Sequence, residues 1–212
     1  MYQLILTTLL AFCAAPLAFS ILPTSSSPFD IPEEMITTMT WDVQAHPSGP
    51  NLTLHGTVQE VHAQLKKLNP NYDNEDWGDS DSDSDSDKDT MSKNLSAHLD
   101  HAKRNKYLYC LPYGDEKGAW PRPTTDNIEY LRKRKGQPKL YGNRCASVSC
   151  SWRSSIWWCN DDRNTRALPA YNNVADGAQV VVNGCQRNDM EQFGGALDHV
   201  DLWRVVVRDG RC

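Results

Sequence analysis

The segment Cys150–Asp161, which reads CSWRSSIWWCND, decides the fold of this chain. Two cysteines enclose three tryptophans, and the run then changes into Asn160-Asp161-Asp162. Large aromatic side chains between cysteines are typical of the core of a small disulfide-bonded domain. We therefore expect the residues after Arg104 to form a domain around this segment, and the residues before it to form a leader.

The central segment admits two geometries. In the first, Ser154-Ser155 is the two-residue turn of a hairpin, and Cys150 faces Cys159 at disulfide distance. Ser-Ser is a poor type I′ turn, because that turn prefers Asn-Gly or Gly-rich pairs. In the second, Cys150 ends a loop, Ser155–Asn160 is a central strand, and both cysteines bond distant partners. We favour the second.

The tryptophans also suggest a binding surface, because indole rings stack on sugar faces. The candidate binding residues are Trp152, Trp158, Asp161 and Asp162. Core packing is the interpretation we favour for the tryptophans, since a domain of 108 residues needs large apolar groups. Trp157 and Trp158 point to opposite faces of a strand, so we expect one of them to be partly exposed.

Six of the seven cysteines lie after Arg104. An even number in an oxidising compartment predicts three disulfides. Zinc sites need closely spaced pairs such as C-x2-C, whereas 34, 4, 8, 25 and 26 residues separate these cysteines, so we expect no metal or other cofactor. The six predicted disulfide cysteines are Cys110, Cys145, Cys150, Cys159, Cys185 and Cys212.

An apolar run over residues 3–20 predicts secretion. It ends in Ala18-Phe19-Ser20, where small residues suit signal peptidase, so we expect cleavage after Ser20. A membrane anchor is the alternative. The signal peptide (residues 1–20) is favoured because Pro16 interrupts the run, which barely reaches the roughly 20 residues of a membrane span. The predicted location is extracellular.

Residues 21–104 form an acidic leader with 6 Lys and Arg against 15 Asp and Glu, whereas 105–212 carry 16 against 12. We expect the leader to be largely disordered: Ile21–Pro50 shows no apolar period, and Asp79–Asp89 alternates Asp with Ser. Sequons mark Asn51 and Asn94 as N-glycosylation sites.

One short helix is predicted near residues 57–69 of the leader. Thr57 and Glu60 fit a capping box, apolar residues repeat at helical spacing, and Pro70 ends the element. The helix either packs within the leader or covers an apolar face of the later domain.

A dibasic pair, Lys103-Arg104, follows a polar stretch just before the first cysteine of the domain. Exposed polar segments suit proteases, so we expect a processing protease to cut after Arg104 and release residues 105–212. The alternative is an ordinary surface pair.

The remaining pattern predicts a small α+β domain: an antiparallel sheet with about two helices. Thr124 or Thr125 caps a helix over 126–135 that Gly136 ends. Residues 171–184 have helical spacing but contain the β-prone Val180-Val181-Val182, and we favour a helix. Strands are expected at 107–111 and 201–208.

Catalytic signals are few. Asp161 and Asp162 are a candidate carboxylate pair for glycoside hydrolysis, but adjacent residues in a strand point to opposite faces. His199 stands between Asp198 and Asp201 in a predicted turn, which is typical of a surface histidine.

The order YC, E-Y-L-R, N-R-C-A-S-V-S-C-S, S-I-W-W-C-N-D, V-A-D-G-A-Q-V-V-V-N-G-C and W-x-V-V-V-x-x-G-x-C resembles a group of secreted fungal cysteine-containing proteins discussed as candidate effectors. More distantly, the chain is similar to the smut-fungus viral killer toxin, a small α/β sandwich with an antiparallel sheet. That similarity implies a disulfide between Cys150 and Cys212.

We therefore expect an effector-like or toxin-like protein that is not an enzyme. It would act as a monomer on a surface component of a host or competitor, whether protein, glycan or membrane component. Nucleic acid is not favoured, because no dense basic stripe is present. The alternatives are a small secreted hydrolase of glycan or RNA, and a carbohydrate-binding module.

Overall fold

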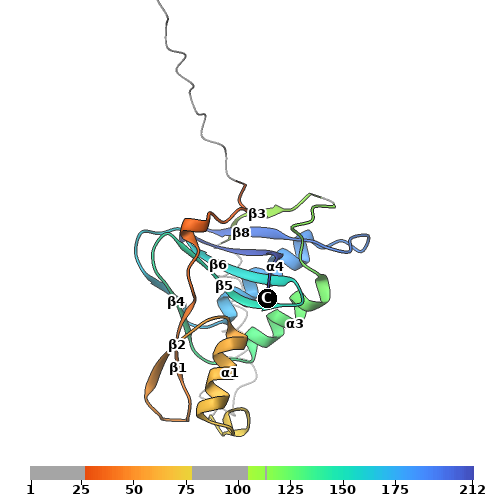
Figure 1. Ribbon diagram of the computed structural model, residues 1–212. Coiled ribbons are helices and arrows are strands. Elements are labelled where there is room, and N and C mark those ends of the chain that lie inside the picture. Colours follow the sequence, from red (N-terminus) through yellow and green to blue (C-terminus); the bar gives the residue numbers. More distant parts are fainter. Residues whose placement is uncertain (1–26, 78–104, 113) are drawn as a thin grey trace, which may run out of the picture.

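The structure of the chain is a computed structural model that describes residues 27–77, 105–112 and 114–212 (Figure 1). This part of the chain holds two antiparallel sheets, three α-helices and three disulfides, which confirms the expected disulfide-stapled α+β sandwich. The predictions for the signal peptide with Ser20, for Asp79–Asp89, for Asn94 and for Lys103-Arg104 lie outside the described residues.

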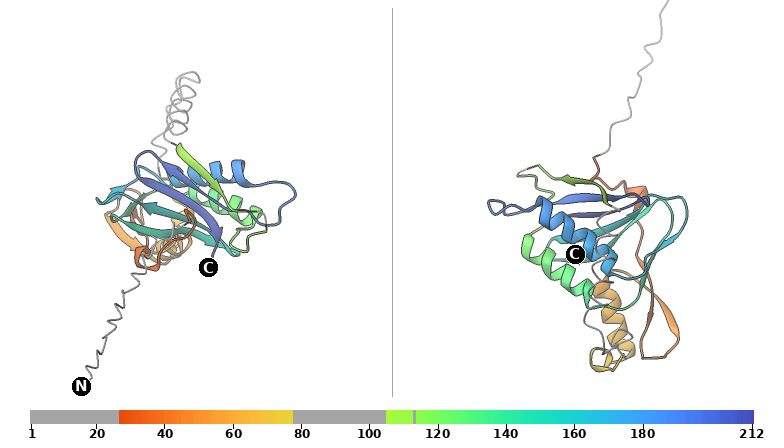
Figure 2. Two further views of the ribbon diagram at one scale, coloured as in Figure 1. Left: turned by 90° about the horizontal axis from the view of Figure 1, so that it is seen from above. Right: turned by 180° about the vertical axis from the view of Figure 1, so that it is seen from behind.

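The first sheet belongs entirely to the residues after Arg104. Its strand order is β3 (Asn105–Cys110), β8 (Gly195–His199), β9 (Trp203–Asp209), β6 (Ser154–Asn160) and β5 (Arg144–Ser151). Helices α3 (Pro121–Arg132) and α4 (Asn172–Cys185) lie side by side against one face (Figure 2). Gly177 allows α4 to pack closely against β9, because a Cβ at this position would come within 2.7 Å of Val205 Cγ2.

The second sheet joins the two halves of the sequence. Its order is β2 (Asn51–His55), β1 (Thr40–Gln44), β4 (Gln137–Leu140) and β7 (Arg166–Ala167). The first two strands precede Arg104 and the last two follow it. Helix α1 (Val58–Leu68) and the 3-10 helices η1 (Glu33–Met35) and η2 (Tyr72–Asn74) complete the earlier half.

The expectation that Ile21–Pro50 lacks regular structure is wrong for its described part. Residues 27–77, called the N-terminal segment below, form η1, β1, β2, α1 and η2. Met39, Trp41 and Val43 are at most 3% exposed and belong to the same hydrophobic core as Trp158. Buried and partly buried residues alternate in β1 over only five residues, which is too short to identify a strand in a stretch rich in Pro, Ser and Thr. The strand is formed by pairing with β4, which the sequence of β1 alone does not indicate.

The hairpin β5–β6 corrects both geometries proposed for the central segment. The turn is Trp152-Arg153 rather than Ser154-Ser155, with φ angles of +46° and +59°. Cys150 faces Ser155, so its predicted pairing with Cys159 is wrong, and it lies in a strand rather than at a loop end. The predicted central strand is confirmed, because β6 lies between β5 and β9.

Three disulfides link the six predicted cysteines. Cys145 bonds Cys159 across the hairpin, and Cys150 bonds Cys212, as the resemblance to the killer toxin implies. The third bond joins Cys110 to Cys185 and so holds β3 to the end of α4.

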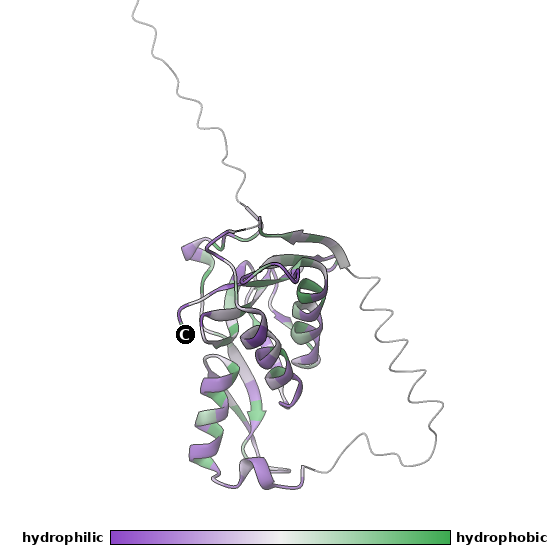
Figure 3. Cartoon of the chain, turned by 90° about the vertical axis from the view of Figure 1, so that its right-hand side faces the viewer, coloured by the Kyte–Doolittle hydropathy of each residue, from purple (hydrophilic) through white to green (hydrophobic). Residues whose placement is uncertain are grey.

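Helix α1 matches its prediction closely. The Thr57 hydroxyl accepts from the Glu60 N–H, and a Glu60 carboxylate oxygen accepts from the Thr57 N–H at 2.7 Å. The helix carries hydrophilic as well as hydrophobic residues (Figure 3), and Val58, Val61 and Leu65 are the buried ones. Helix α1 therefore covers an apolar face of the later domain, which was one of the two predicted roles.

Helix α4 is also confirmed, and the β-prone valines lie inside it because its buried residues repeat at helical spacing. Helix α3 begins five residues earlier than predicted, at Pro121. Thr124 and Thr125 therefore lie in its first turns, where their hydroxyls donate to the carbonyls of Trp120 and Pro121.

Candidate binding surface

Trp152 is the most exposed of the large hydrophobic side chains that the structure describes, at 83%. It occupies the first position of the β5–β6 turn with left-handed backbone, which costs roughly 1–2 kcal/mol for a residue other than glycine. Arg153 at the second position adopts the same conformation. Asn-Gly would form this turn with less backbone strain, so the stability of the fold does not explain the presence of Trp-Arg. Backbone strain of this kind is often found at functional sites.

A second tryptophan lies beside this turn. Trp120, 37% exposed, precedes α3, and together with Pro123, Trp152 and Arg153 it lines a shallow, mainly apolar depression of about 350 Å³. We call these four residues the tryptophan platform. Proline at the first and third positions of α3 stiffens the backbone beneath it, since its ring fixes φ.

Ser154 ties the two halves of the platform together. Its hydroxyl accepts from the Trp120 N–H at 2.8 Å, and its carbonyl accepts from the buried Asn127 side chain at 3.0 Å. Asn127 in turn accepts from the Ser151 hydroxyl at 2.9 Å. A buried network in which the polar groups are satisfied rigidifies its surroundings, so the platform has a firm base.

Gln59 of α1 completes this base from the N-terminal segment. Its amide donates to Asn127 at 3.1 Å and to the Ser149 hydroxyl at 2.7 Å, and its carbonyl accepts from the Cys150 N–H at 3.3 Å. The side chain thus bonds both the hairpin and α3. The N-terminal segment supports the platform without lining it.

The C-terminus secures the outer side of the turn. Arg153 Nε donates to Asp209 at 3.0 Å, and the Arg153 carbonyl accepts from the Gly210 N–H. The Cys150–Cys212 disulfide fixes the last residue to the same hairpin. The Arg153 guanidinium is therefore engaged within the protein at one edge of the platform.

Of the four binding residues expected from sequence, only Trp152 lies on the platform. Trp158 is fully buried and packs in the core, whereas its neighbour Trp157 is partly exposed, as predicted. Asp161 and Asp162 follow β6 at the end opposite the turn. The chain therefore does not bring the aspartates to the exposed tryptophan.

Both aspartates hold local structure. Asp161 pairs with Arg204 at 3.3 Å, and burial raises the pKa of its carboxyl against the opposing effect of Arg204. Asp162 accepts from the Asn164 N–H at 3.1 Å, and this bond and neighbouring ones lower its pKa. Their opposite shifts arise from separate surroundings.

His199 differs from its prediction. It lies in β8 rather than in a turn, is 3% exposed, and stacks on Trp203 with ring centroids 3.6 Å apart and an interplanar angle of 4°. The expectation of a surface histidine is therefore wrong. Its ring is a core element of the β8–β9 hairpin.

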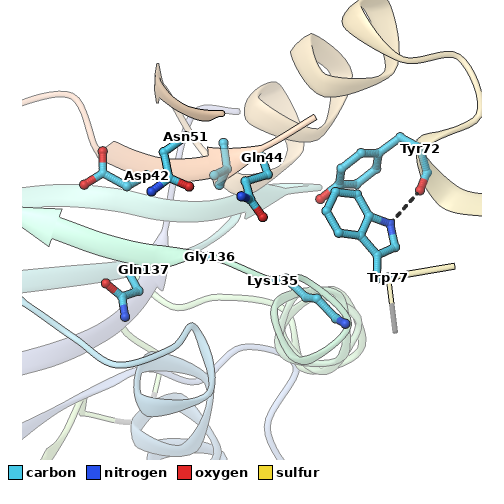
Figure 4. A pocket seen from close by; sticks show the side chains of 9 residues that line it. Asp42, Gln44, Asn51, Tyr72, Trp77, Lys135, Gly136 and Gln137 are labelled. Carbon is cyan, nitrogen blue, oxygen red and sulfur yellow. Dashed lines mark hydrogen bonds between the residues drawn. The ribbon is translucent and has the colours of Figure 1, made fainter. Parts of the chain in front are cut away.

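A more polar pocket opens beside the N-terminal segment (Figure 4). Its volume is about 400 Å³, and its lining combines amide and carboxylate side chains of the β1–β2 hairpin with Lys135, Gly136 and Gln137. Trp77 lines one end, where its indole N–H donates to the Tyr72 carbonyl at 3.1 Å. The hairpin residues that line the pocket are Asp42, Val43, Gln44 and Asn51.

The predicted glycosylation site Asn51 is therefore part of this pocket wall, and its side chain is exposed. A glycan attached there would start inside the opening. The sequon identifies Asn51 as an accessible residue from the sequence. The pocket could not be predicted in the same way, because residues from separate parts of the chain line it.

A charged cluster adjoins the pocket residues Tyr72 and Lys135 in the sequence. Asp73 contacts Lys66 at 2.9 Å, His62 at 2.6 Å and Arg134 at 3.0 Å. Lys66, with His62 and Arg134, holds the pKa of Asp73 well below its usual range. The other ring nitrogen of His62 bonds the Tyr130 hydroxyl. The contacts of His62 with Tyr130 and of Asp73 with Arg134 thus join the N-terminal segment to α3 and to the residues that follow it.

The sequence matches no protein-family model, and no curated protein matches it significantly. Within the described residues, no helix is long and apolar enough to cross a membrane.

Proposed function

We propose that this chain is a secreted effector-like or toxin-like protein that binds a surface component of a host or competitor cell through the tryptophan platform. The observation that carries the proposal is Trp152, 83% exposed in a strained turn beside Trp120. Three disulfides and the apolar leader sequence support secretion.

A protein partner fits the platform best. Tryptophan and arginine are enriched at the hot spots of protein interfaces, where a rigid apolar anchor fills a pocket on the partner. A sugar-binding site combines an aromatic side chain, which stacks on the sugar, with several side chains that hydrogen-bond to the sugar hydroxyls. Here Arg153 alone is polar among the four platform residues, and its guanidinium already donates to Asp209.

Binding to intact cells tests this proposal. Fluorescently labelled wild-type protein and the variants Trp152→Asn and Leu202→Asn are applied to plant and fungal cells, before and after protease treatment of the cell surface. All three proteins are produced without N-glycosylation, because Trp152→Asn creates the sequon Asn-Arg-Ser. We expect protease-sensitive binding that Trp152→Asn weakens by about 30-fold, the effect of a hot-spot residue of roughly 2 kcal/mol. Equal binding by Trp152→Asn would exclude the platform, and binding lost only after periodate oxidation would identify a glycan.

Leu202 is the matched control. It is exposed at 55%, has left-handed backbone with φ of +60°, and lies in the β8–β9 turn, away from the platform. Replacing it with Asn makes the same chemical change on the same kind of backbone. Its binding should equal that of the wild type.

A carbohydrate-binding module is the second candidate, and the pocket of Figure 4 favours it. Its amides, carboxylate and Trp77 offer both hydrogen bonds and a ring. Titration of unglycosylated protein with soluble oligosaccharides should quench tryptophan fluorescence, and Trp77→Phe should reduce the quenching. A Trp152→Asn variant that quenches normally would separate this site from the platform.

The hydrolase alternative receives no support from Asp161, Asp162 or His199, because each is held in separate local structure. A folded sample that hydrolyses glycan or RNA, and loses that activity on Asp161→Asn, would restore it.

A further inference from the structure

The N-terminal segment contributes to the core of the domain that the dibasic pair is expected to release. Trp41 is completely buried, and its ring packs against that of Tyr171 with centroids 4.4 Å apart. Six residues of this segment, each at most 3% exposed, belong to the shared core: Met39, Trp41, Val43, Val58, Val61 and Leu65. Its loss would expose these contacts on both sides.

Backbone pairing continues across the same boundary. Strand β1 pairs with β4 in antiparallel register, with Thr40 opposite Lys139. Further back, the Thr37 N–H donates to the Cys145 carbonyl at 2.9 Å. Removal of the N-terminal segment would therefore leave β4 with an open edge, and unpaired strand edges favour aggregation.

Polar contacts reinforce this docking at several separate places. Asp30 pairs with Lys117 at 2.9 Å, and the Phe29 carbonyl accepts from Arg208 at 3.1 Å. The Glu34 carbonyl accepts from Arg144 at 2.7 Å. Gln59 and Asp73 add the buried and charged contacts described above. The N-terminal segment thus touches the later residues from its first described residues to its last helix.

No covalent bond other than the peptide chain secures these contacts. All three disulfides join cysteines that follow Arg104, and the N-terminal segment contains no cysteine. A cut between residues 78 and 105, which includes the predicted cut after Arg104, would leave two polypeptides held by packing, strand pairing and hydrogen bonds alone.

We infer that cutting the chain in this interval does not release residues 105–212 as a separate domain. The mature form is a non-covalent two-chain protein, in which the fragment containing residues 27–77 remains docked on the disulfide-bonded fragment. The retained fragment keeps Gln59 beneath the tryptophan platform. This changes the expected role of the leader from a disposable segment to a structural subunit.

The test severs the folded full chain and measures whether its fragments stay together. Secreted protein is cut with a dibasic-specific protease. A variant with a site-specific protease site inserted after Asp89 is cut in parallel, so that severing does not depend on natural processing. Size-exclusion chromatography at micromolar concentration separates the species, and denaturing gels and intact mass identify the fragments in each peak.

We expect both fragments in one peak at the elution volume of the uncut chain, with an unchanged near-ultraviolet circular dichroism spectrum. Separation of the fragments under native conditions would overturn the inference, whether the later fragment stays soluble or aggregates. Trp41→Ala and Tyr141→Ala together test whether docking is specific, because Trp41 is buried and Tyr141 is exposed. The dissociation constant of the two fragments should be at least ten-fold higher for cut Trp41→Ala protein than for cut Tyr141→Ala protein. Equal dissociation of the two variants would also contradict it.

This outcome is independent of what the platform binds. A cut protein whose fragments remain together but which fails to bind cells would overturn the proposed function and leave the two-chain form intact.

Discussion

The Trp41 ring, which precedes the predicted processing site in the chain, packs at a tilt against that of Tyr171, which follows it, with ring centroids 4.4 Å apart and an interplanar angle of 32°. The Tyr171 hydroxyl lies beside Gly136, whose φ of +128° brings the chain from α3 into β4. Burial holds the pKa of Tyr171 well above its usual range. The contact therefore joins the N-terminal segment to the start of α4 in a buried part of the core.

Trp41→Ala should destabilise the uncut chain by about 3–5 kcal/mol, because it removes a buried aromatic side chain and leaves a cavity. The free energy of unfolding in urea measures this effect. Tyr141→Ala should change it by less than about 0.5 kcal/mol, as expected for an exposed position. Similar values for the two variants would mean that the N-terminal segment does not share the core.

Trp152→Asn should raise stability while it weakens binding. Asparagine tolerates left-handed backbone better than tryptophan, so we expect a gain of up to about 1 kcal/mol in the free energy of unfolding. Leu202→Asn should give a similar gain without loss of binding. A destabilised Trp152→Asn protein would show that the indole contributes to the fold rather than to recognition.

The disulfides should differ in their response to reduction. Cys145 and Cys159 are fully buried, whereas Cys110 and Cys212 are exposed, so dithiothreitol should reduce the Cys110–Cys185 and Cys150–Cys212 bonds before the Cys145–Cys159 bond. Peptide mapping of alkylated samples, taken over time without full reduction, measures the order. Early alkylation of Cys145 would contradict the burial of that pair.

Replacing both Cys150 and Cys212 with serine should cost about 4 kcal/mol, the loop-entropy value for their separation of 62 residues. Denaturant unfolding under oxidising conditions checks this magnitude. A loss below about 1 kcal/mol would mean that the other contacts of the terminus, such as Arg153 with Asp209, hold it without the bond.

Asp73 should make the docking of the N-terminal segment sensitive to acid. Its pKa is lowered in the folded protein, so its stabilising contribution is present above about pH 4, the usual aspartate range, and is lost as the pH falls toward the folded pKa. The melting temperature of the wild type should exceed that of Asp73→Asn at pH 6. The difference should shrink between pH 4 and pH 2.

Asp126→Asn is the matched control for this comparison, because Asp126 is an exposed acid on α3. Added salt should also narrow the difference for Asp73, whose side chain is 37% exposed. A constant difference from pH 6 to pH 2 would assign the effect of Asp73→Asn to something other than its charge.

The sequence predicts the elements whose signals are local. Thr57 and Glu60 place the start of α1 correctly, and the spacing of Val174, Ala178 and Val181 identifies α4 despite its β-prone run. Strand β8 escapes prediction, because Gly195–His199 is short and contains no β-branched residue. The predicted hairpin turn is misplaced, because Trp152-Arg153 contradicts the usual chemistry of such turns.

The platform depends on a contact between distant parts of the sequence. The sequence identifies Trp152 but not Trp120, because the residues through Pro123 resemble a loop. Proline at the first helical position is the available signal for an earlier start of α3. A correct start for α3 would still not place Trp120 beside the hairpin. That placement depends on the hydrogen bond from the Trp120 N–H to the Ser154 hydroxyl, which forms only in the folded sheet.

The Trp152-Arg153 turn also predicts how the protein responds to opposing selections. A library of random variants sorted only for resistance to heat or protease should accumulate Asn or Gly at these two positions. The same library sorted for cell binding should retain Trp at position 152. Positions where the two selections disagree would outline the contact surface residue by residue, even while the partner is unidentified.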